Sequence, residues 1–237
     1  MILVIAERHD HAALWLARRL SARAAGRVAT VTPLQLVCST SIAHRLSTAG
    51  SSSAFVLADG TRLDLAAVTG VVNRMAAMPM AHLASASAAD QDYAASEWHA
   101  FLLGWLASLA CPVLNPPAPE WLAGALHSSL AATQLALAAG LAVEGDGAGD
   151  TAEPDPSADS MPETTHFACC GRLVGPILEP AAREAILSFA HAYGAPLLQV
   201  ETVAAPERRR FLRATSFPDF TRGGSALVGA IERALAT

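Results

Sequence analysis

The chain opens with a strand–helix–strand pattern, and this pattern constrains the fold more than any other feature. Residues 2–6 form a continuous apolar run, which is typical of a parallel strand buried on both faces. Apolar residues at helical spacing follow in residues 9–25, and Gly26 is expected to end that helix. A second apolar run occupies residues 28–31. The sequence therefore predicts an α/β fold with an open, mostly parallel sheet.

Composition excludes several classes of protein. The 237 residues are 52% hydrophobic and carry a net charge of −5, and all sixteen basic residues are arginine. No basic stripe is present, so a nucleic-acid partner is not expected. The longest apolar runs, residues 100–114 and 130–143, are too short or broken by proline to cross a bilayer. The N-terminus lacks a signal-peptide pattern. We therefore expect a cytoplasmic protein without a membrane partner.

Most later elements can be predicted from periodicity and turn residues. Asp59-Gly60 indicates a hairpin turn, whereas the Ser-rich residues 47–53 are expected to break the preceding segment. Asp90 is expected to cap a long helix at residues 92–110. The remaining expected elements are strands at residues 71–75, 111–115 and 197–203, a strand and turn at 211–220, helices at 119–141, 180–193 and 224–236, and a bent strand pair at 166–177.

A stretch rich in Gly, Asp, Pro, Ser and Glu gives the clearest boundary, at residues 145–165. It contains almost no large apolar residue, so it is expected to be a flexible linker or surface loop. The predicted organisation is a first α/β domain at residues 1–143, a linker at residues 144–165, and a smaller α+β portion at residues 166–237 packed on the first domain.

The order of the elements resembles an ATP-grasp ligase of the branch that acts on peptides and proteins. The resemblance is carried by VVNRM at residues 71–75, DYAASEW at 92–98, CPVLNP at 111–116, HFACCGR at 166–172, and the stretch from Val200 to Phe220. It implies that residues 1–143 match the domain that precedes the ATP-grasp domain. It also implies that residues 166–237 are a remnant of the C-terminal part of the ATP-grasp domain.

Two departures from the family pattern argue against ATP chemistry. The family places most of its ATP-binding strands between the positions that match Leu141 and His166, where this chain has only the linker. The three magnesium ligands of the family match Glu201, Arg213 and Thr215. A guanidinium repels a magnesium ion, and the chain has no lysine to hold phosphates. The resemblance therefore implies a degenerate former metal site that binds no metal and no cofactor.

An ion pair between Glu201 and Arg213 is the expected replacement for the metal, because opposite charges on neighbouring strands are commonly juxtaposed. The alternative is that both side chains are solvated strand residues.

Asn73 and Arg74 are candidates for peptide binding, because they end a predicted strand and open α/β sheets bind ligands at the carboxyl ends of their strands. Arg74 could hold a peptide carboxylate in a fork. The alternative for Arg74 is a structural salt bridge with Asp92 or Glu97.

The long helix carries further candidates. Tyr93 and Trp98 are candidate peptide contacts if exposed, since aromatic side chains are typical anchors, and their alternative role is core packing. Asp92, Glu97 and His99 are the acid–base groups that an enzyme could use.

The leading hypothesis is a peptide-binding protein without ATP-dependent chemistry. The resemblance implies a ribosomal precursor or leader peptide as partner, bound during natural-product biosynthesis, for example along an open sheet edge. One alternative is a cofactor-free enzyme that cyclises or isomerises the bound peptide. A second is a non-catalytic subunit of an ATP-grasp ligase complex. A homodimer is expected because loss of a domain exposes apolar surface, and a biosynthetic enzyme is a further expected partner.

Overall fold

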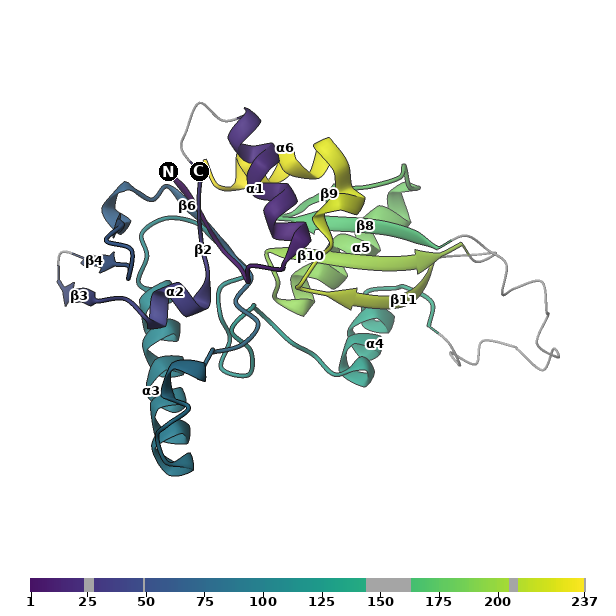
Figure 1. Ribbon diagram of the computed structural model, residues 1–237. Coiled ribbons are helices and arrows are strands. Elements are labelled where there is room, and N and C mark those ends of the chain that lie inside the picture. The colour runs from purple at the N-terminus through teal and green to yellow at the C-terminus, as the bar shows by residue number, and fades with distance from the viewer. Residues whose placement is uncertain (24–27, 49, 144–162, 205–208, 237) are drawn as a thin grey trace. The chain divides into compact units, whose positions relative to one another are not determined.

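The computed structural model describes residues 1–23, 28–48, 50–143, 163–204 and 209–236 (Figure 1). These residues form two units. The first comprises Met1–Ala125 and Ile231–Thr237, and the second comprises Leu126–Ala230. Most of the expected linker at residues 144–165 lies outside the described residues, although its last residues belong to a strand of the second unit.

A parallel sheet organises the first unit and confirms the predicted fold class. Its strands, in spatial order, are β2 (Val28–Val31), β1 (Ile2–Ile5), β6 (Gly70–Asn73) and β7 (Val113–Leu114). Every neighbouring pair is parallel. The helix α1 (His11–Arg23) connects β1 to β2. Leu3, Val4 and Ile5 are fully buried, which explains why this strand has no polar face.

A small antiparallel sheet completes the strands of the first unit. It contains β3 (Ser41–Ser47), β4 (Gly50–Val56) and β5 (Arg62–Asp64), with β3 and β5 at its edges. The predicted turn at Asp59-Gly60 is confirmed, and the predicted break at residues 47–53 is confirmed only at its start, because β3 ends at Ser47 and β4 begins at Gly50. The serines at 51–53 lie inside β4, where the hydroxyls of Ser51 and Ser53 find partners. Ser53 Oγ lies 2.7 Å from His44 Nδ1, and Ser51 donates to the Ser108 carbonyl.

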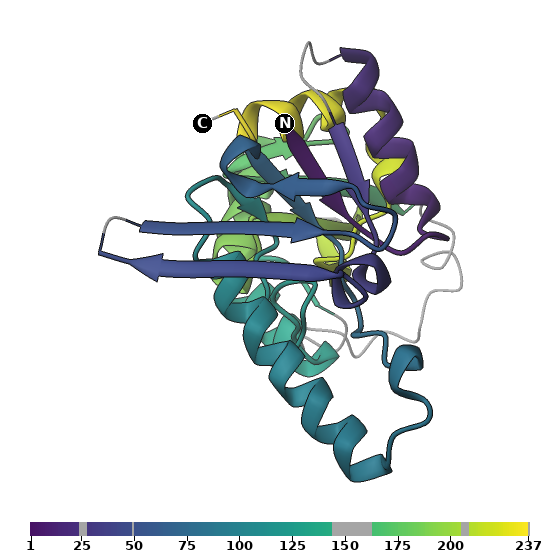
Figure 2. The same cartoon turned by 60° about the vertical axis from the view of Figure 1, so that its left-hand side comes forward.

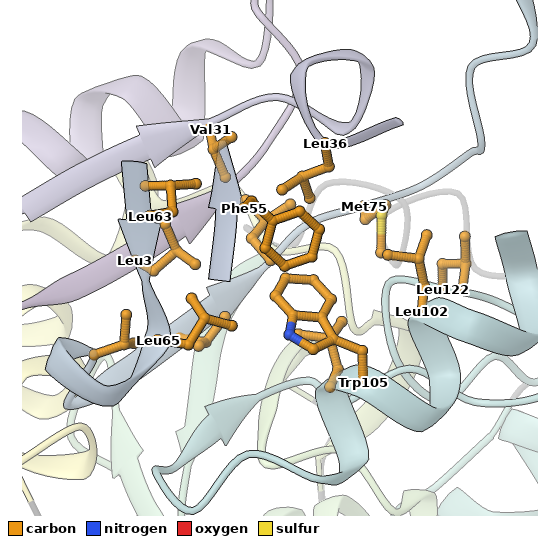
Figure 3. Packing of buried hydrophobic residues seen from close by; sticks show 14 of the residues in the cluster. Leu3, Val31, Leu36, Phe55, Leu63, Leu65, Met75, Leu102, Trp105 and Leu122 are labelled. Atoms are coloured by element: carbon orange, nitrogen blue, oxygen red, sulfur yellow. The ribbon is translucent and has the colours of Figure 1, made fainter. Parts of the chain in front are cut away.

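The helix α3 (Ala88–Ala107) packs on this small sheet. Ring centroids of Phe55 and Trp105 lie 4.9 Å apart, and the cluster around them extends onto the parallel sheet (Figure 3). The predicted start of this helix is wrong by one turn. Ser87, not Asp90, is the N-cap, because the Ser87 hydroxyl accepts from the Asp90 backbone N–H at 3.2 Å.

Short elements connect the larger ones in the first unit. They are α2 (Pro33–Val37), the 3₁₀ turn η1 (Leu65–Ala67) and the 3₁₀ turn η2 (Ala81–Leu83).

The predicted helix at residues 119–141 is much shorter in the structure, where α4 (Ser129–Ala138) begins only after its N-cap Ser128. A tight turn occupies the preceding residues, with backbone hydrogen bonds in both directions between Ala118 and Trp121. Gly124 follows with φ +113°, where a side chain would be strained. Apolar content alone did not reveal this turn.

An antiparallel sheet organises the second unit. Its strands, in spatial order, are β11 (Arg210–Thr215), β10 (Leu197–Val203), β8 (Thr164–Cys169) and β9 (Arg172–Val174). The helix α5 (Pro180–Tyr193) has the predicted bounds, and so does β10. Pro180 begins the helix, and Gly194 ends it in the left-handed conformation at φ +76°.

The two faces of this sheet differ in character. Phe211 packs on Phe189 of α5 with ring centroids 5.1 Å apart, and Ala168 lines a hollow together with residues of α5. Ala168 pairs with Leu198, so the side chains of Gln199 and Glu201 point to the opposite face. The 3₁₀ turn η4 (Phe220–Gly223) lies on that opposite face, and α6 (Gly224–Ala234) follows it.

The last residues of the chain return to the first unit. The division between the units falls inside α6, after Ala230. Leu235 packs so closely on Gly70 that a side-chain carbon at position 70 would lie 2.8 Å from Leu235 Cβ. The first unit is therefore discontinuous in sequence.

Among the helices that the structure describes, none combines the length and the hydropathy that a membrane crossing requires.

Candidate functional site

The β10–β11 pair brings together the three residues that the resemblance assigned to a former metal site. Glu201 is the cross-strand partner of Arg213, and Gln199 is the partner of Thr215. A register shift follows between Glu201 and Thr202, so the strands stay in register over the residues that form the site. Side chains opposite each other on one face of a sheet lie close enough to interact, and those of Glu201 and Arg213 do so here.

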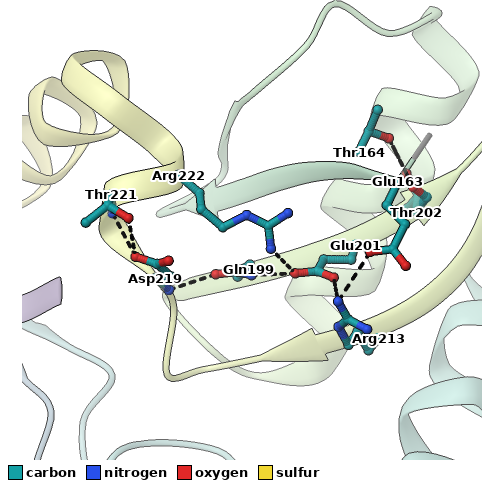
Figure 4. A network of polar contacts seen from close by, with 9 residues as sticks. All are labelled: Glu163, Thr164, Gln199, Glu201, Thr202, Arg213, Asp219, Thr221 and Arg222. Atoms are coloured by element: carbon teal, nitrogen blue, oxygen red, sulfur yellow. Dashed lines mark hydrogen bonds and ion pairs between the residues drawn. The ribbon is translucent and has the colours of Figure 1, made fainter. Parts of the chain in front are cut away.

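The carboxylate of Glu201 is buried between two guanidinium groups (Figure 4). Its exposed fraction is 3%. Arg213 forms an ion pair with Oε2, and Arg222 Nη1 donates to Oε1 at 2.5 Å. The Gln199 side-chain amide donates to the same oxygen at 2.7 Å. The predicted ion pair between Glu201 and Arg213 is confirmed.

Gln199 and Asp219 hold the turn that carries Arg222 (Figure 4). The Asp219 backbone N–H donates to Gln199 Oε1 at 2.8 Å. Asp219 in turn caps η4, because its carboxylate accepts from the backbone N–H and the hydroxyl of Thr221 at 3.0 and 2.6 Å. Arg222 follows directly, so these hydrogen bonds fix the position from which its guanidinium reaches Glu201.

The outer parts of the site are solvated. Arg213 is 64% exposed and also lies 3.3 Å from the half-exposed Glu163 carboxylate. Among the described residues, no hydrogen bond joins Thr215 to Glu201. The Thr215 hydroxyl accepts from the Phe217 backbone N–H at 3.0 Å and so stabilises the turn after β11.

This set of donors does not fit a magnesium ion. Magnesium requires oxygen ligands, preferably anionic, in an octahedral arrangement. The one buried carboxylate is already neutralised by two cations, which would repel a divalent ion at contact distance. Within the described part of the chain, no group of three His, Cys, Asp or Glu residues could hold a metal ion.

Sequence reasoning missed Gln199 and Arg222. Gln199 could have been found, because it lies two residues before Glu201 on a strand and therefore shares its face. Arg222 gave no such signal, because it reaches the site through a turn and not through strand periodicity.

Asn73 is committed to the fold of the first unit. Its side-chain amide donates to the carbonyls of Asn115 and Leu122 at 2.8 and 2.6 Å, and its Oδ1 accepts from the Met75 backbone N–H at 3.2 Å. The side chain is buried, so it joins the end of β6 to the segments that follow β7.

Arg74 is also buried, and its partner differs from the predicted one. Its Nε and Nη2 donate to the two carboxylate oxygens of Asp10 at 2.6 and 3.1 Å. The alternative of a salt bridge with Asp92 or Glu97 is therefore wrong. Asp10 follows β1 and caps α1, where it also accepts from the Ala13 backbone N–H at 3.0 Å. A bidentate pair of this kind is strong and directional.

The aromatic candidates lie apart from these residues. Tyr93 is 68% exposed on α3, and no ring contact is recorded for it among the described residues. Trp98 is half-buried, with its ring centroid 5.6 Å from that of Phe101. Trp105, on the same helix, is 1% exposed and belongs to the core.

The three acid–base candidates on α3 do not form a joined constellation. Asp92 and Glu97 are exposed, and His99 Nε2 lies 3.1 Å from the Pro119 carbonyl oxygen. No hydrogen bond or ion pair is recorded among the three side chains in the part of the chain that the structure describes. Their arrangement offers no paired general acid and base.

His166 is a buried base on β8. Its side chain is fully buried, and neither ring nitrogen has a hydrogen-bond partner among the residues that the structure describes. Desolvation, together with the positive charge of Arg209, lowers the pKa of His166 from 6.5 to about 4. The side chain is therefore neutral at pH 7.

Several solved structures have a similar fold. The macrocyclase MdnC bound with precursor peptide MdnA, from Microcystis aeruginosa MRC, matches with a TM-score of 0.71 at 13% identity, over 100% of this chain and 99% of that chain. A RiPP-associated ATP-grasp ligase from Chryseobacterium gregarium, in complex with ADP and a leader and core peptide, matches with a TM-score of 0.70 at 11% identity, over 99% and 95%. The chain shares the fold of these ligases.

A third structure of this fold is the ATP-grasp ligase PsnB complexed with precursor peptide PsnA2 and AMPPNP. It matches with a TM-score of 0.67 at 12% identity, over 100% of this chain and 98% of that chain. No protein-family profile matches the sequence, and no curated protein does so either. The resemblance to ATP-grasp ligases is therefore confirmed at the level of the fold.

The buried Asp10–Arg74 pair predicts a stability effect. Asp10→Asn keeps the oxygen that caps α1 but leaves a buried guanidinium without its counter-charge, so the free energy of unfolding should fall by about 3 kcal/mol. Adding Arg74→Met should restore most of that loss. Urea denaturation of both variants measures it, and a double variant that is less stable than Asp10→Asn would contradict the prediction.

His166 predicts a pH dependence of stability. Because its folded-state pKa of about 4 lies below its ordinary value of 6.5, the unfolded chain binds more protons between these values. The contribution of His166 is therefore complete above pH 6.5 and declines as the pH falls towards 4. At pH 5 the loss should be about 2 kcal/mol. Urea denaturation at pH 7 and pH 5 should show this loss in the wild type and not in His166→Phe.

The exposed His191 provides the control for this measurement. His191→Gln should keep the wild-type difference between the two pH values. If His166→Phe also keeps it, another group causes the pH dependence.

Proposed function

We propose that this protein binds a peptide without ATP-dependent chemistry, and that the peptide is a precursor peptide in the biosynthesis of a ribosomal natural product. The fold supports the peptide part of the proposal, because the similar structures of MdnC, PsnB and the Chryseobacterium gregarium ligase contain precursor, leader or core peptides.

The observation that supports the absence of ATP-dependent chemistry is the buried Glu201 carboxylate. Arg213 and Arg222 supply two positive charges to one negative charge at the position that the resemblance assigns to magnesium. A buried carboxylate has to be paired, and this one is paired by the protein itself. A nucleotide that needs magnesium to offset its phosphate charge would meet no metal ligand there.

The sequence supports the same conclusion independently. The chain contains no lysine. The resemblance implies that ATP-grasp ligases hold the phosphates of ATP with this compact cation, for which arginine is not a simple substitute.

Association with other chains belongs to the proposal. The exposed side chains of Leu130 and Leu137 lie two turns apart on one face of α4. Exposed apolar groups at this spacing support a homodimer, or a complex with an enzyme that acts on the same peptide. The proposed location is the cytoplasm.

Titration calorimetry tests the proposal directly. Synthetic peptides encoded by genes beside this one should bind in a buffer that contains EDTA and no nucleotide. MgATP alone should give no binding heat, because no metal ligand is available at Glu201. The proposal fails if none of these peptides binds, or if binding requires MgATP.

Restoring the two lost magnesium ligands tests whether Arg213 and Thr215 are the reason that no metal binds beside Glu201. Arg213→Glu combined with Thr215→Asn replaces the cation with a second carboxylate and an amide oxygen. Two neighbouring carboxylates repel each other, so the double variant should be less stable, and millimolar Mg²⁺ should raise its melting temperature by binding the folded state. The wild type should not respond.

Arg172→Glu gives the matched control, since Arg172 is an exposed arginine on the same sheet. This variant should show no magnesium response. A wild type that is stabilised by Mg²⁺ as strongly as the double variant would show that the arginines do not exclude the metal.

A further inference from the structure

The strand β3 lies at an edge of its sheet among the strands that the structure describes. The order of the small sheet is β3-β4-β5, and β3 pairs only with β4 among the strands of the described residues (Figure 2). Half of the backbone N–H and C=O groups of an edge strand point away from its neighbour. β3 spans seven residues and contains no proline, which is long for an unprotected edge. Such an edge is a template for one more strand.

A hollow lies beside this edge, on the face that packs against α3. Its lining residues are Ile42 of β3 together with Glu97, Trp98 and Phe101 of α3, and its volume is about 250 Å³. This is smaller than the usual site for a drug-sized ligand and suits a single side chain. Phe101 forms one wall, held by edge-on ring contacts with Trp98 at 5.6 Å and His44 at 5.9 Å.

The edge and the hollow have compatible geometry. Ile42 and His44 lie two residues apart on β3, so they share the face that meets α3. A strand added beside β3 would present every second side chain to the same face. One of these side chains would lie over the hollow, and the next would lie about 7 Å further along.

The charges around the hollow indicate which peptide side chain would lie next to the one in the hollow. Glu97 is exposed at the hollow, and no ion pair is recorded for it among the described residues. Trp98 offers an aromatic face beside it, which attracts a cation further. The net charge of −5 for the whole chain acts in the same direction.

We propose that β3 binds an extended peptide segment as an additional strand, with a large apolar side chain in the hollow and an arginine or lysine two residues away beside Glu97 and Trp98. This inference rests on the proposed peptide-binding function and adds its location and its sequence preference. Backbone hydrogen bonds supply affinity, and the hollow and the carboxylate supply specificity.

Selection from a displayed library of random ten-residue peptides tests the inference on the full-length protein. Enriched sequences should share an aromatic or aliphatic residue with Arg or Lys two positions away. The tightest of them, synthesised with a fluorescent label, should bind at least tenfold more weakly to Trp98→Ala and to Glu97→Arg in anisotropy titrations. Glu97→Arg should instead bind better to the same peptide with its basic residue replaced by Glu.

Two protein variants serve as matched controls. Glu120→Arg makes the same charge change at another exposed carboxylate, and Trp15→Ala removes a half-buried tryptophan of α1. Both should bind the selected peptide as the wild type does. Two peptides should be compared, one N-methylated at its odd-numbered amides and one at its even-numbered amides. One should lose binding and the other should keep it, because only alternate N–H groups face β3.

Other outcomes distinguish the failure of the proposed site at β3 from the failure of the proposed peptide-binding function. If peptides are enriched but bind equally to Trp98→Ala and Glu97→Arg, this site is wrong while peptide binding stands. If no peptide is enriched and the neighbouring precursor peptides also fail to bind, both are wrong. A dimer in light scattering that Glu97→Arg dissociates would show that a second copy occupies this edge, which would overturn the inference.

Discussion

A carboxylate removed from water needs a cation, and this requirement shapes both units of the protein. In the second unit Glu201 is held by Arg213 and Arg222, and in the first Asp10 is held by Arg74. Each pair also fixes a chain reversal, η4 in one case and the start of α1 in the other. Arginine suits both positions, since its planar group forms several directed hydrogen bonds and keeps its charge when buried.

These pairs explain why residues at promising positions are not free to bind a ligand. Asn73 and Arg74 stand at the carboxyl end of a parallel strand, where many α/β proteins bind substrates. Here their polar atoms are satisfied by Asn115, Leu122 and Asp10. The exposed features available for recognition lie elsewhere in the first unit, on α3 and at the edge of β3. The polar side chains at the carboxyl end of β6 therefore serve the stability of the first unit.

The sequence predicted those elements whose limits are set by local chemistry. The bounds of α5 follow from Pro180 and Gly194, and β10 follows from apolar and polar residues that alternate along residues 198–201. The prediction failed where contacts with residues far away in the sequence determine the limits of an element. The serines of β4 look like a loop until Ser108 and His44 satisfy them, and α4 cannot begin before the turn at Gly124. At the candidate site, the resemblance and the opposite charges on neighbouring strands predicted the Glu201–Arg213 pair, whereas Arg222 reaches the site through a turn that gave no signal in the sequence.

The contact between Gly70 and Leu235 has a consequence for synthesis on the ribosome. Domains generally fold in the order in which they emerge, from the N-terminus onward. The first unit cannot follow this order completely, because Leu235 belongs to it and is translated after the whole second unit. Residues 126–230 are thus an insertion whose antiparallel sheet can close first. The parallel sheet of the first unit therefore gains Leu235 as a packing partner only after the second unit has been translated.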